Sequence, residues 1–231
     1  CFIYIGGNDS MDTIKKLSDY AILRGHPTKF LGVPKTIDND LALTDHTPGY
    51  GSAAKYIGTS VKEIIQDSQA LIYDKGLVTI VEIMGRNAGW LVGAAALSKG
   101  EDCDGPDLIY VPELPFDIDN FLVRIKELLA EKTFVVVAVS EGIHYADGSF
   151  VSEAKTAATD GFGHKQLTGT ANYLARRLAQ EIGCKTRTIE LSSMQRAASH
   201  LASRIDILEA FQVGGAAVKA ADEGDTGEMV I

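Results

Sequence analysis

The feature that most constrains the fold is a regular alternation of short apolar runs with longer amphipathic segments. The apolar runs are rich in β-branched and aromatic residues, as expected of strands buried in a parallel sheet. They occupy residues 1–5, 28–33, 77–84, 107–113, 133–142, 186–191 and 227–231. Segments with helical spacing of apolar residues occupy 11–23, 51–66, 88–97, 117–132 and 167–183, with one or two more within 192–224. Strands that alternate with helices predict a three-layer α/β protein with parallel sheets.

Composition narrows the range of functions. The chain has 231 residues, 45% of them hydrophobic, which suits one large domain or two small ones with a substantial core. Its formal net charge is −9, so a general nucleic-acid binder is not expected, because binding to backbone phosphates needs a basic face. No apolar run is long enough to cross a bilayer. We therefore expect neither nucleic acid nor a membrane as a partner.

The cysteines and histidines indicate no structural metal. Cys1, Cys103 and Cys184 are far apart, odd in number and without a C-x-x-C pair, so neither a disulfide framework nor a zinc site is predicted. The five histidines, His164 among them, lack metal-ligand spacing and receive no role. The expected location is the reducing cytoplasm.

Both ends of the sequence resemble the interior of a sheet. The chain opens on Cys1 inside one strand-like run and closes on another, at 227–231. We expect the chain to be a piece of a longer protein.

Polar loops follow the predicted strands, at the edge where parallel sheets bind ligands. "GGNDS", from Gly6 to Ser10, links a strand to a helix and is suited to cradle a phosphate with backbone amides. The alternative is a plain tight turn in which Asp9 or Ser10 caps the helix.

"PKTIDND" offers more pointed chemistry. Lys35, Asp38 and Asp40 are candidates for an electrophile, a general base and a metal-associated carboxylate. The alternative is a polar loop, because Asp and Asn are common turn residues.

Other strand tips carry single charged residues. Arg86, in "MGRN", is suited to grip a phosphate with its forked guanidinium, or it is a surface arginine. Glu141, in "VSEG", accepts a hydrogen bond from a sugar hydroxyl or caps the turn that follows. Arg187 and Arg196 are expected on the surface or in ion pairs.

Seven short stretches of the sequence, taken in order, resemble the phosphofructokinase family. They are "GGNDS", "GVPKTIDNDL", "TDHTPGYGSA", "VEIMGRNAGW", "VPELPFD", "VSEG" and "RTIELSSMQR", and they extend over most of the chain. The resemblance implies a phosphofructokinase-like fold of two three-layer α/β/α domains with mainly parallel sheets. It implies a phosphoryl-donor domain at 1–48 plus 196–231, a sugar-phosphate domain at 49–195, and an N-terminal βα segment that is missing here.

The resemblance also implies roles for individual residues. Asp38 would be the base that takes the proton of the 1-hydroxyl of fructose 6-phosphate, with Lys35 and Thr36 as further catalytic residues. The donor would be bound by Gly6, Gly7, Asp9 and Ser10. The substrate would be bound by Thr36, Ile37, Asp38, Met84, Gly85, Arg86, Glu141, Arg187 and Arg196. Mg²⁺ would be held by Asn8 and Asp40. In family oligomers the arginine matched by Arg187 reaches in from a neighbouring subunit, so a homo-oligomer is expected.

The identity of the phosphoryl donor depends on two positions. ATP-using members carry glycine at the positions of Asp9 and Lys35, which leaves room for the α-phosphate and its nucleoside. A carboxylate at Asp9 would repel an α-phosphate, and the Lys35 ammonium would stabilise a shorter donor and the transition state. Inorganic pyrophosphate is therefore the predicted donor.

Three departures from ATP-using relatives keep alternatives open. Asn8 stands where those enzymes have a magnesium-binding aspartate, Ser193 stands where many have histidine, and Leu77 stands at the position of a substrate-binding arginine. The runner-up is an ATP-dependent 6-phosphofructokinase. A non-catalytic regulatory subunit of the same fold is the second alternative, and the presence of Asp38 argues against it.

Overall fold

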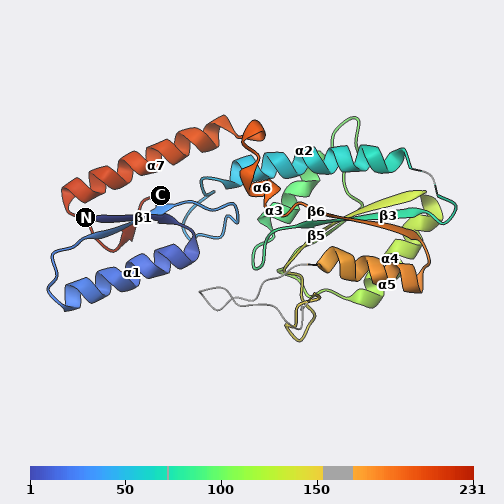
Figure 1. Ribbon diagram of the computed structural model, residues 1–231, viewed down its shortest axis with the longest axis horizontal. Coiled ribbons are helices and arrows are strands. Elements are labelled where there is room, and N and C mark those ends of the chain that lie inside the picture. The colour runs from blue at the N-terminus through green and yellow to red at the C-terminus, as the bar shows by residue number, and fades with distance from the viewer. Residues whose placement is uncertain (72, 153–168) are drawn as a thin grey trace. The chain divides into compact units, whose positions relative to one another are not determined.

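The computed structural model in Figure 1 describes residues 1–71, 73–152 and 169–231. The predicted alternation of strands and helices is confirmed. The strands are β1 (Phe2–Gly6), β2 (Phe30–Pro34), β3 (Leu77–Ile83), β4 (Leu108–Tyr110), β5 (Phe134–Ser140), β6 (Lys185–Glu190) and β7 (Glu228–Met229). The helices are α1 (Asn8–Leu23), α2 (Tyr50–Gln69), α3 (Trp90–Gly93), α4 (Ile118–Glu131), α5 (Thr170–Glu181), α6 (Met194–Ala197) and α7 (Arg204–Glu223), with short 3₁₀ helices η1 (Ala94–Ser98) and η2 (Ser199–Leu201).

The chain forms two compact units. The first consists of Cys1–Ala53 with Ser199–Ile231, and the second of Ala54–Ala198. The roles expected of two such parts, donor binding and sugar-phosphate binding, remain predictions.

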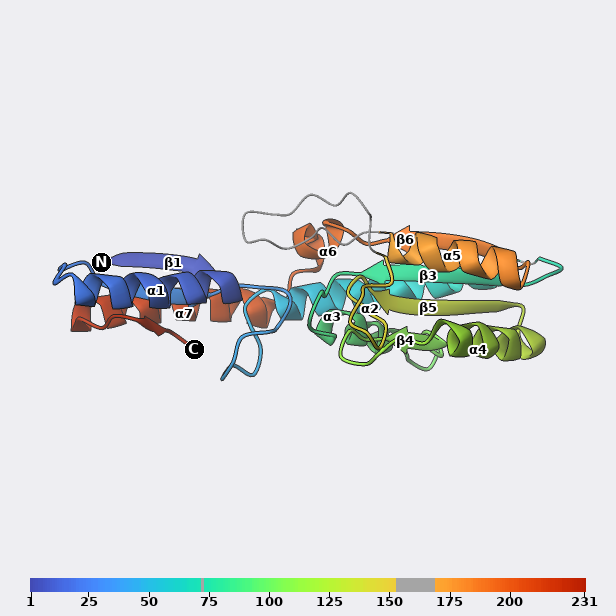
Figure 2. The same ribbon diagram turned by 90° about the horizontal axis from the view of Figure 1, so that it is seen from below.

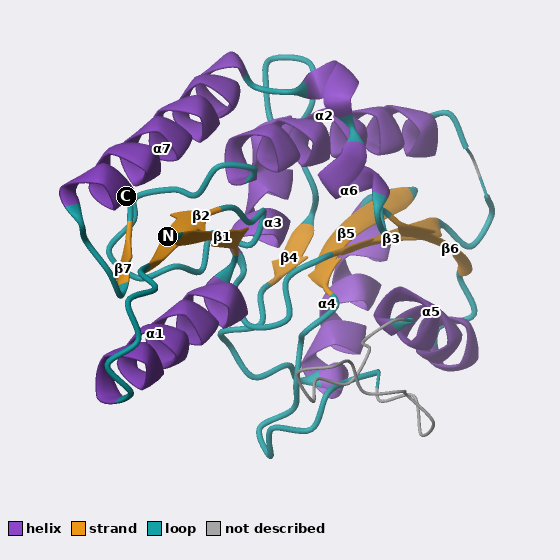
Figure 3. Ribbon diagram, turned by 60° about the vertical axis from the view of Figure 1, so that its left-hand side comes forward, coloured by secondary structure: helices purple, strands orange, loops and turns teal. Residues whose placement is uncertain are grey.

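The first unit is built on a small parallel sheet of order β1-β2-β7. Its α1 and α7 lie on opposite faces of that sheet (Figures 1 and 3). Leu31 and Val33 of β2 are buried, as are Ile14 of α1 and Ala217 of α7, which is expected of a central strand that is covered on both sides. Ile5, on the edge strand β1, remains largely exposed.

The second unit contains the larger core. Its parallel sheet has the order β4-β5-β3-β6, with α4 and α5 on one face and α2 on the other (Figures 1 and 2). Every residue of β3 is buried, which explains why its sequence shows no polar alternation. Ile80 packs into a cluster with Phe121 of α4 and Leu174 of α5. On the other face, the hydroxyls of Thr79 and Ser68 of α2 lie 3.0 Å apart.

Several predicted helix boundaries are wrong, among them the end of α2, which lies at Gln69 rather than at residue 66. α1 begins at Asn8 rather than at residue 11, its N-cap is Gly7, and no side chain caps it. Asp9 and Ser10 therefore lie in the first turn instead of capping the helix. The cause is Gly7, whose extended backbone starts the helix directly after β1.

The helix predicted at 88–97 also begins later than expected. α3 begins at Trp90 and η1 follows it, because the backbone N–H of Gly89 donates to the Glu113 carboxylate at 2.6 Å and so remains in a loop. Of the helix predicted at 167–183, residues 167–168 lie outside the described residues, as does His164, and α5 occupies 170–181. Within the described ranges, no helix combines the length and apolar character that crossing a membrane requires.

Candidate active site

In the first unit, two polar loops meet because their strands are paired. β1 and β2 run parallel with Gly6 opposite Pro34, so "GGNDS" and "PKTIDND" leave the sheet at the same edge. The backbone N–H of Lys35 donates to the Gly6 carbonyl at 3.0 Å, which continues the ladder by one bond. Residues that are 29 positions apart in sequence, Gly6 and Lys35, are thereby fixed side by side.

Close packing requires glycine at position 6, whereas a side chain at position 7 would make only ordinary contacts. A Cβ on Gly6 would lie 2.0 Å from the hydroxyl oxygen of Ser10, so any side chain here would displace Ser10. A Cβ on Gly7 would lie 3.6 Å from that of Thr36, which places the N-terminus of α1 against the second loop. The first turn of α1 has backbone N–H groups without intrahelical acceptors, and these favour an anion.

Asp40 is the most unusual carboxylate of this cluster. Its Oδ2 accepts a 2.9 Å hydrogen bond from the side-chain amide of Asn8, whereas its buried Oδ1 has no hydrogen-bond partner among the described residues. Burial raises the pKa of Asp40, and the nearby charges of Asp38 and Asp9 raise it further, against a lowering by a backbone hydrogen bond. A neighbouring cation would relieve this repulsion.

The donor set fits magnesium shared with a phosphate better than a metal cage made by the protein alone. Among the described residues no group of three or more His, Cys, Asp or Glu is arranged to hold a metal ion. Mg²⁺ commonly binds one or two carboxylates together with substrate phosphates and water. Asp40 supplies such a carboxylate. Asn8 presents its amide nitrogen to Asp40 and its carbonyl to the N–H of Asp9, so its predicted contact with the metal stays a prediction.

The residues predicted to contact the transferred group lie in one short turn. Thr36 is buried, and its hydroxyl oxygen accepts the backbone N–H of Asp38 at 3.1 Å. Asp38 and Ile37 are half-buried, and Lys35 is exposed. Within the described chain no ion pair involves Lys35, so its ammonium is available to an anion.

A second pair of loops meets in the other unit. Ile83 lies opposite Ser140 at the ends of β3 and β5, and the backbone N–H of Glu141 donates to the Ile83 carbonyl at 2.9 Å. The backbone N–H of Gly85 points at the Glu141 carboxylate, at 3.4 Å, and the Ser140 hydroxyl donates to the Gly85 carbonyl. The strand tips predicted to bind the sugar phosphate, 84–86 and 141, are therefore adjacent.

Backbone contact fixes Arg86 within this pair of loops. A Cβ on Gly142 would lie 2.0 Å from the Arg86 carbonyl oxygen, so only glycine allows the two backbones to approach this closely. Gly85 has φ +134°, a conformation that side chains disfavour. Arg86 itself is half-buried.

Gln195 is a residue that the sequence reasoning missed. It is buried, its Oε1 accepts the backbone N–H of Met84 at 3.2 Å, and its amide donates to the Ser192 carbonyl. Arg196, exposed on α6, follows Gln195 directly in the sequence. The string "SSMQR" contained the only signal, a glutamine beside an arginine.

Arg187 is not brought to these loops. It lies within β6 opposite Thr79, several residues before the strand tips, and pairs with Asp67 at 2.5 Å. The expectation of an ion-paired arginine is confirmed. Its contact with substrate stays a prediction, in which the Arg187 side chain enters the substrate site of a neighbouring subunit.

Glu82 is a second residue that the sequence reasoning missed. It is buried on β3 and accepts the backbone N–H groups of Gly169, at 3.2 Å, and Ala171, at 2.8 Å, at the start of α5. Burial raises the pKa of Glu82, and Glu190 adds to the rise, while the N–H donors oppose it. Glu82 thus accepts hydrogen bonds from backbone N–H groups at the N-terminus of α5 that have no acceptor within the helix.

Comparison with known proteins agrees with this arrangement. A family model described as Phosphofructokinase matches residues 1–221. The pyrophosphate–fructose 6-phosphate 1-phosphotransferase of Xanthomonas campestris pv. campestris is 47% identical over 223 residues, which are 96% of this chain and 53% of that protein. The enzyme of the same name from Halomonas elongata is 41% identical over 99% of this chain and 54% of its own length.

Solved structures show the same likeness. The crystal structure of a pyrophosphate-dependent phosphofructokinase from Nitrosospira multiformis superposes with a TM-score of 0.81 at 34% identity, covering 97% of this chain and 52% of that one. The chain thus spans about half the length of the relatives it matches. With the family model matching nearly the whole sequence, the chain belongs to the phosphofructokinase family.

Proposed function

We propose that the parent protein transfers a phosphoryl group reversibly from inorganic pyrophosphate to the 1-hydroxyl of fructose 6-phosphate. The observation that carries the proposal is the bond from the Lys35 N–H to the Gly6 carbonyl, which joins the loop of Asp9 to the loop of Lys35. Asp9 and Lys35, which would exclude a nucleotide and favour a short donor, thus lie in loops that leave the sheet at the same edge. Relatives at 41–47% identity carry the name of this activity.

Donor binding would use the N-terminus of α1 and the Lys35 ammonium. Backbone N–H groups in the first turn of α1 would receive phosphate oxygens. Lys35 would neutralise charge on bound pyrophosphate and on the loose transition state. Asp9, within that turn, would repel an α-phosphate that carries a nucleoside.

Asp38 would act as the general base. Its carboxylate would take the proton of the sugar 1-hydroxyl while that oxygen forms a bond to the transferred phosphorus and the bridging P–O bond of pyrophosphate breaks. The electron pair of the broken bond leaves with orthophosphate. Thr36 orders the turn by accepting the backbone N–H of Asp38.

Asp40 would hold a magnesium ion together with phosphate oxygens, which fits its unpartnered Oδ1. A bound Mg²⁺ neutralises phosphate charge and so lowers the barrier to transfer. Asn8, which donates to Asp40, would orient that carboxylate.

Sugar-phosphate binding would fall to the second unit. Arg86 and Arg196 would bind the 6-phosphate and Glu141 a sugar hydroxyl, with Met84 and Gly85 presenting backbone to the sugar. Arg187 would serve a neighbouring subunit, so we also propose a homo-oligomer, located in the cytoplasm.

The test is phosphorylation of fructose 6-phosphate by the full-length parent with magnesium and either pyrophosphate or ATP. We expect activity with pyrophosphate, and we expect ATP use to rise in the double variant Asp9→Gly, Lys35→Gly. Activity of the wild type with ATP alone would refute the donor assignment and favour the ATP-dependent alternative. Activity with neither donor would favour a regulatory subunit.

A further inference from the structure

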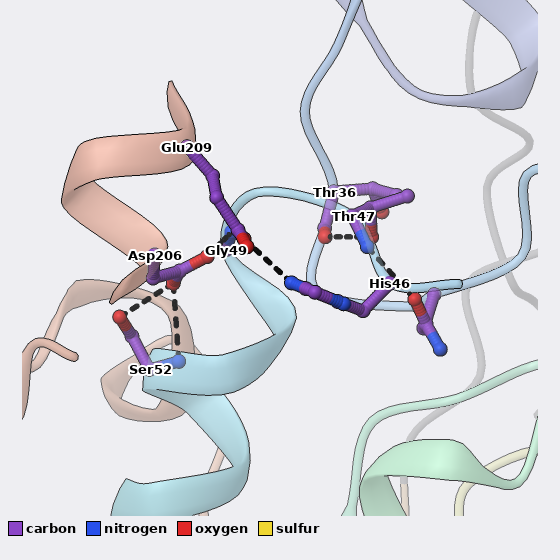
Figure 4. Close-up of polar contacts among 8 residues, drawn as sticks. Thr36, His46, Thr47, Gly49, Ser52, Asp206 and Glu209 are labelled. Carbon is purple, nitrogen blue, oxygen red and sulfur yellow. Dashed lines mark hydrogen bonds and ion pairs between the residues drawn. The ribbon is translucent and has the colours of Figure 1, made fainter. Parts of the chain in front are cut away.

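Asp206 is a buried carboxylate that joins three segments of the first unit. It lies in the first turn of α7 and is 6% exposed. Its Oδ1 accepts the backbone N–H of Gly49 at 2.7 Å, and its Oδ2 accepts both the N–H and the hydroxyl of Ser52, at 3.1 and 2.6 Å (Figure 4). The Ser52 hydroxyl oxygen in turn accepts the backbone N–H of Ser203. Asp206 therefore caps the N-terminus of α2 from another helix, where a carboxylate is most favourable.

The chain at the N-terminus of α2, which Asp206 caps, is in direct contact with the turn that carries Thr36 and Asp38. Gly49 forms a parallel bridge with Thr36, and a Cβ on Gly49 would lie 3.2 Å from the Thr36 carbonyl oxygen. The backbone N–H of Thr36 donates to Pro48 at 3.1 Å, and the Thr47 hydroxyl donates to the Thr36 carbonyl at 2.7 Å (Figure 4). Both backbone groups of Thr36 are therefore held by residues 47–48, next to the residue that Asp206 binds.

A side chain of the turn itself, that of Asn39, also bonds to the segment before α2. The side-chain oxygen of Asn39 accepts the backbone N–H of Thr47 at 2.9 Å, and Asn39 itself has φ +55°, a conformation that asparagine tolerates. Residues 36–39 and 47–49 thus form one hydrogen-bonded body. Asp206 attaches that body to α7, and Glu209, one turn further along α7, adds a bond to His46 at 2.5 Å.

We propose that Asp206 is a positioning residue for phosphoryl transfer, acting on Thr36 and Asp38 through Gly49. The inference rests on the proposed function, because it assigns Asp206 the task of holding the base and its neighbour in reactive geometry. Without its carboxylate, Gly49 and Ser52 lose their shared acceptor and the bridge to Thr36 loosens. A small displacement of a reacting group is enough to lower a rate about 100-fold.

The first experiment compares Asp206→Asn with the wild type in the full-length parent. The amide keeps one acceptor oxygen and replaces the other with a donor, so it can no longer accept from both the Gly49 N–H and the Ser52 N–H. We expect kcat to fall about 10- to 100-fold per folded molecule, with the KM for fructose 6-phosphate nearly unchanged. Glu223→Gln is the matched control, because Glu223 lies on the same helix in an exposed ion pair with Lys219. A variant Asp206→Asn that folds and keeps the wild-type kcat overturns the proposal.

A second pair of variants keeps the test decisive if Asp206→Asn does not fold. Thr47→Val removes the donor to the Thr36 carbonyl and retains the side-chain shape, and Ser52→Ala removes one donor to Asp206. We expect both to lower kcat, and the two effects to be non-additive in the double variant, because both act on one turn. Additive effects, or losses of stability without loss of kcat, would mean that the network is only structural.

Failure of this inference is distinguishable from failure of the proposed function. If the wild type uses ATP instead of pyrophosphate, the same comparison is made with ATP and still decides the role of Asp206. Hydrogen exchange of the backbone N–H groups of Thr36 and Gly49 gives a readout that does not depend on activity. Faster exchange in Asp206→Asn at both positions is expected, and unchanged exchange at Thr36 would overturn the coupling.

Discussion

The two units each contain a partly or fully buried carboxylate whose pKa is raised by burial, but the two side chains differ in what surrounds them. Glu82, on β3, uses both oxygens to receive N–H groups at the start of α5. Asp40, beyond β2, has one oxygen bound to Asn8 and one without a partner, with Asp38 and Asp9 adding repulsion. Burial of a charge is costly unless it is compensated. Glu82 is compensated within the fold, whereas Asp40 lacks that compensation, as expected of a group that awaits a ligand.

The largest effect is expected from removing the like charge beside Asp40. Asp38→Asn should lower kcat about 10²- to 10⁴-fold, because the amide cannot accept the hydroxyl proton. Steady-state kinetics of the full-length parent with pyrophosphate provide the measurement. Asp45→Asn, an exposed carboxylate in the same connection, serves as the control. Retention of wild-type kcat by Asp38→Asn would remove Asp38 from its proposed role.

Asp40→Asn tests whether the uncompensated carboxylate serves a cation. We expect the apparent affinity for Mg²⁺ or the activity to fall about 10- to 100-fold, as for loss of a metal-linked group. The free energy of unfolding should rise at neutral pH, because repulsion with Asp38 and Asp9 disappears. Magnesium titrations of activity and urea denaturation measure the two quantities. A variant that loses stability and keeps its magnesium dependence would make Asp40 a structural residue like Glu82.

Glu82→Gln tests the other half of the comparison. The amide offers one acceptor where two N–H groups need one each, so we expect a loss of about 1–3 kcal/mol in the free energy of unfolding. The kcat per folded molecule should stay close to that of the wild type. Glu190→Gln, an exposed carboxylate bound to Asn172, is the control and should change stability by less than about 0.5 kcal/mol. A fall in kcat without a loss of stability would place Glu82 among the active groups.

The smallest effect concerns pH. Because burial raises the pKa of Glu82 above its ordinary value of 4.5, folding favours the protonated form. Its contribution to stability is fully present below that ordinary value and is lost as pH rises through the raised pKa. The stability difference between wild type and Glu82→Gln should therefore shrink as pH rises from below 4.5 through the raised pKa. Denaturation curves across this range measure it, and a difference that grows with pH would contradict the assigned shift.

Local residue patterns were enough to predict the α/β class and the loops that carry the site. Runs such as Leu77–Ile83 lack polar alternation because both faces of their sheet are covered, and that pattern is visible in any single sequence. Parallel strands of one sheet end at a common edge, so each of these sheets was expected to gather its polar loops there: those after 6 and 34 in the first unit, and those after 83 and 140 in the second. The pairing of Gly6 with Pro34 and of Ile83 with Ser140 agrees with this expectation.

Contacts between distant segments could not be predicted, because hydrophobic periodicity specifies which face is buried and not which polar groups meet. Asp206 reaches Gly49 across 157 positions, and Gln195 reaches Met84 across 111, and no local pattern indicates that these residues pair. Arg187 was grouped with Arg196 by sequence, yet strand register places it opposite Thr79.

By itself, the sequence therefore determined the alternating elements and the chemical groups at the strand tips, because these follow from local spacing and residue type. Only the tertiary structure decided which carboxylate is compensated and which backbone groups hold Thr36 in place. Hydrogen bonds between distant residues depend on how strands and helices are packed, and that packing is not written in any short stretch of sequence.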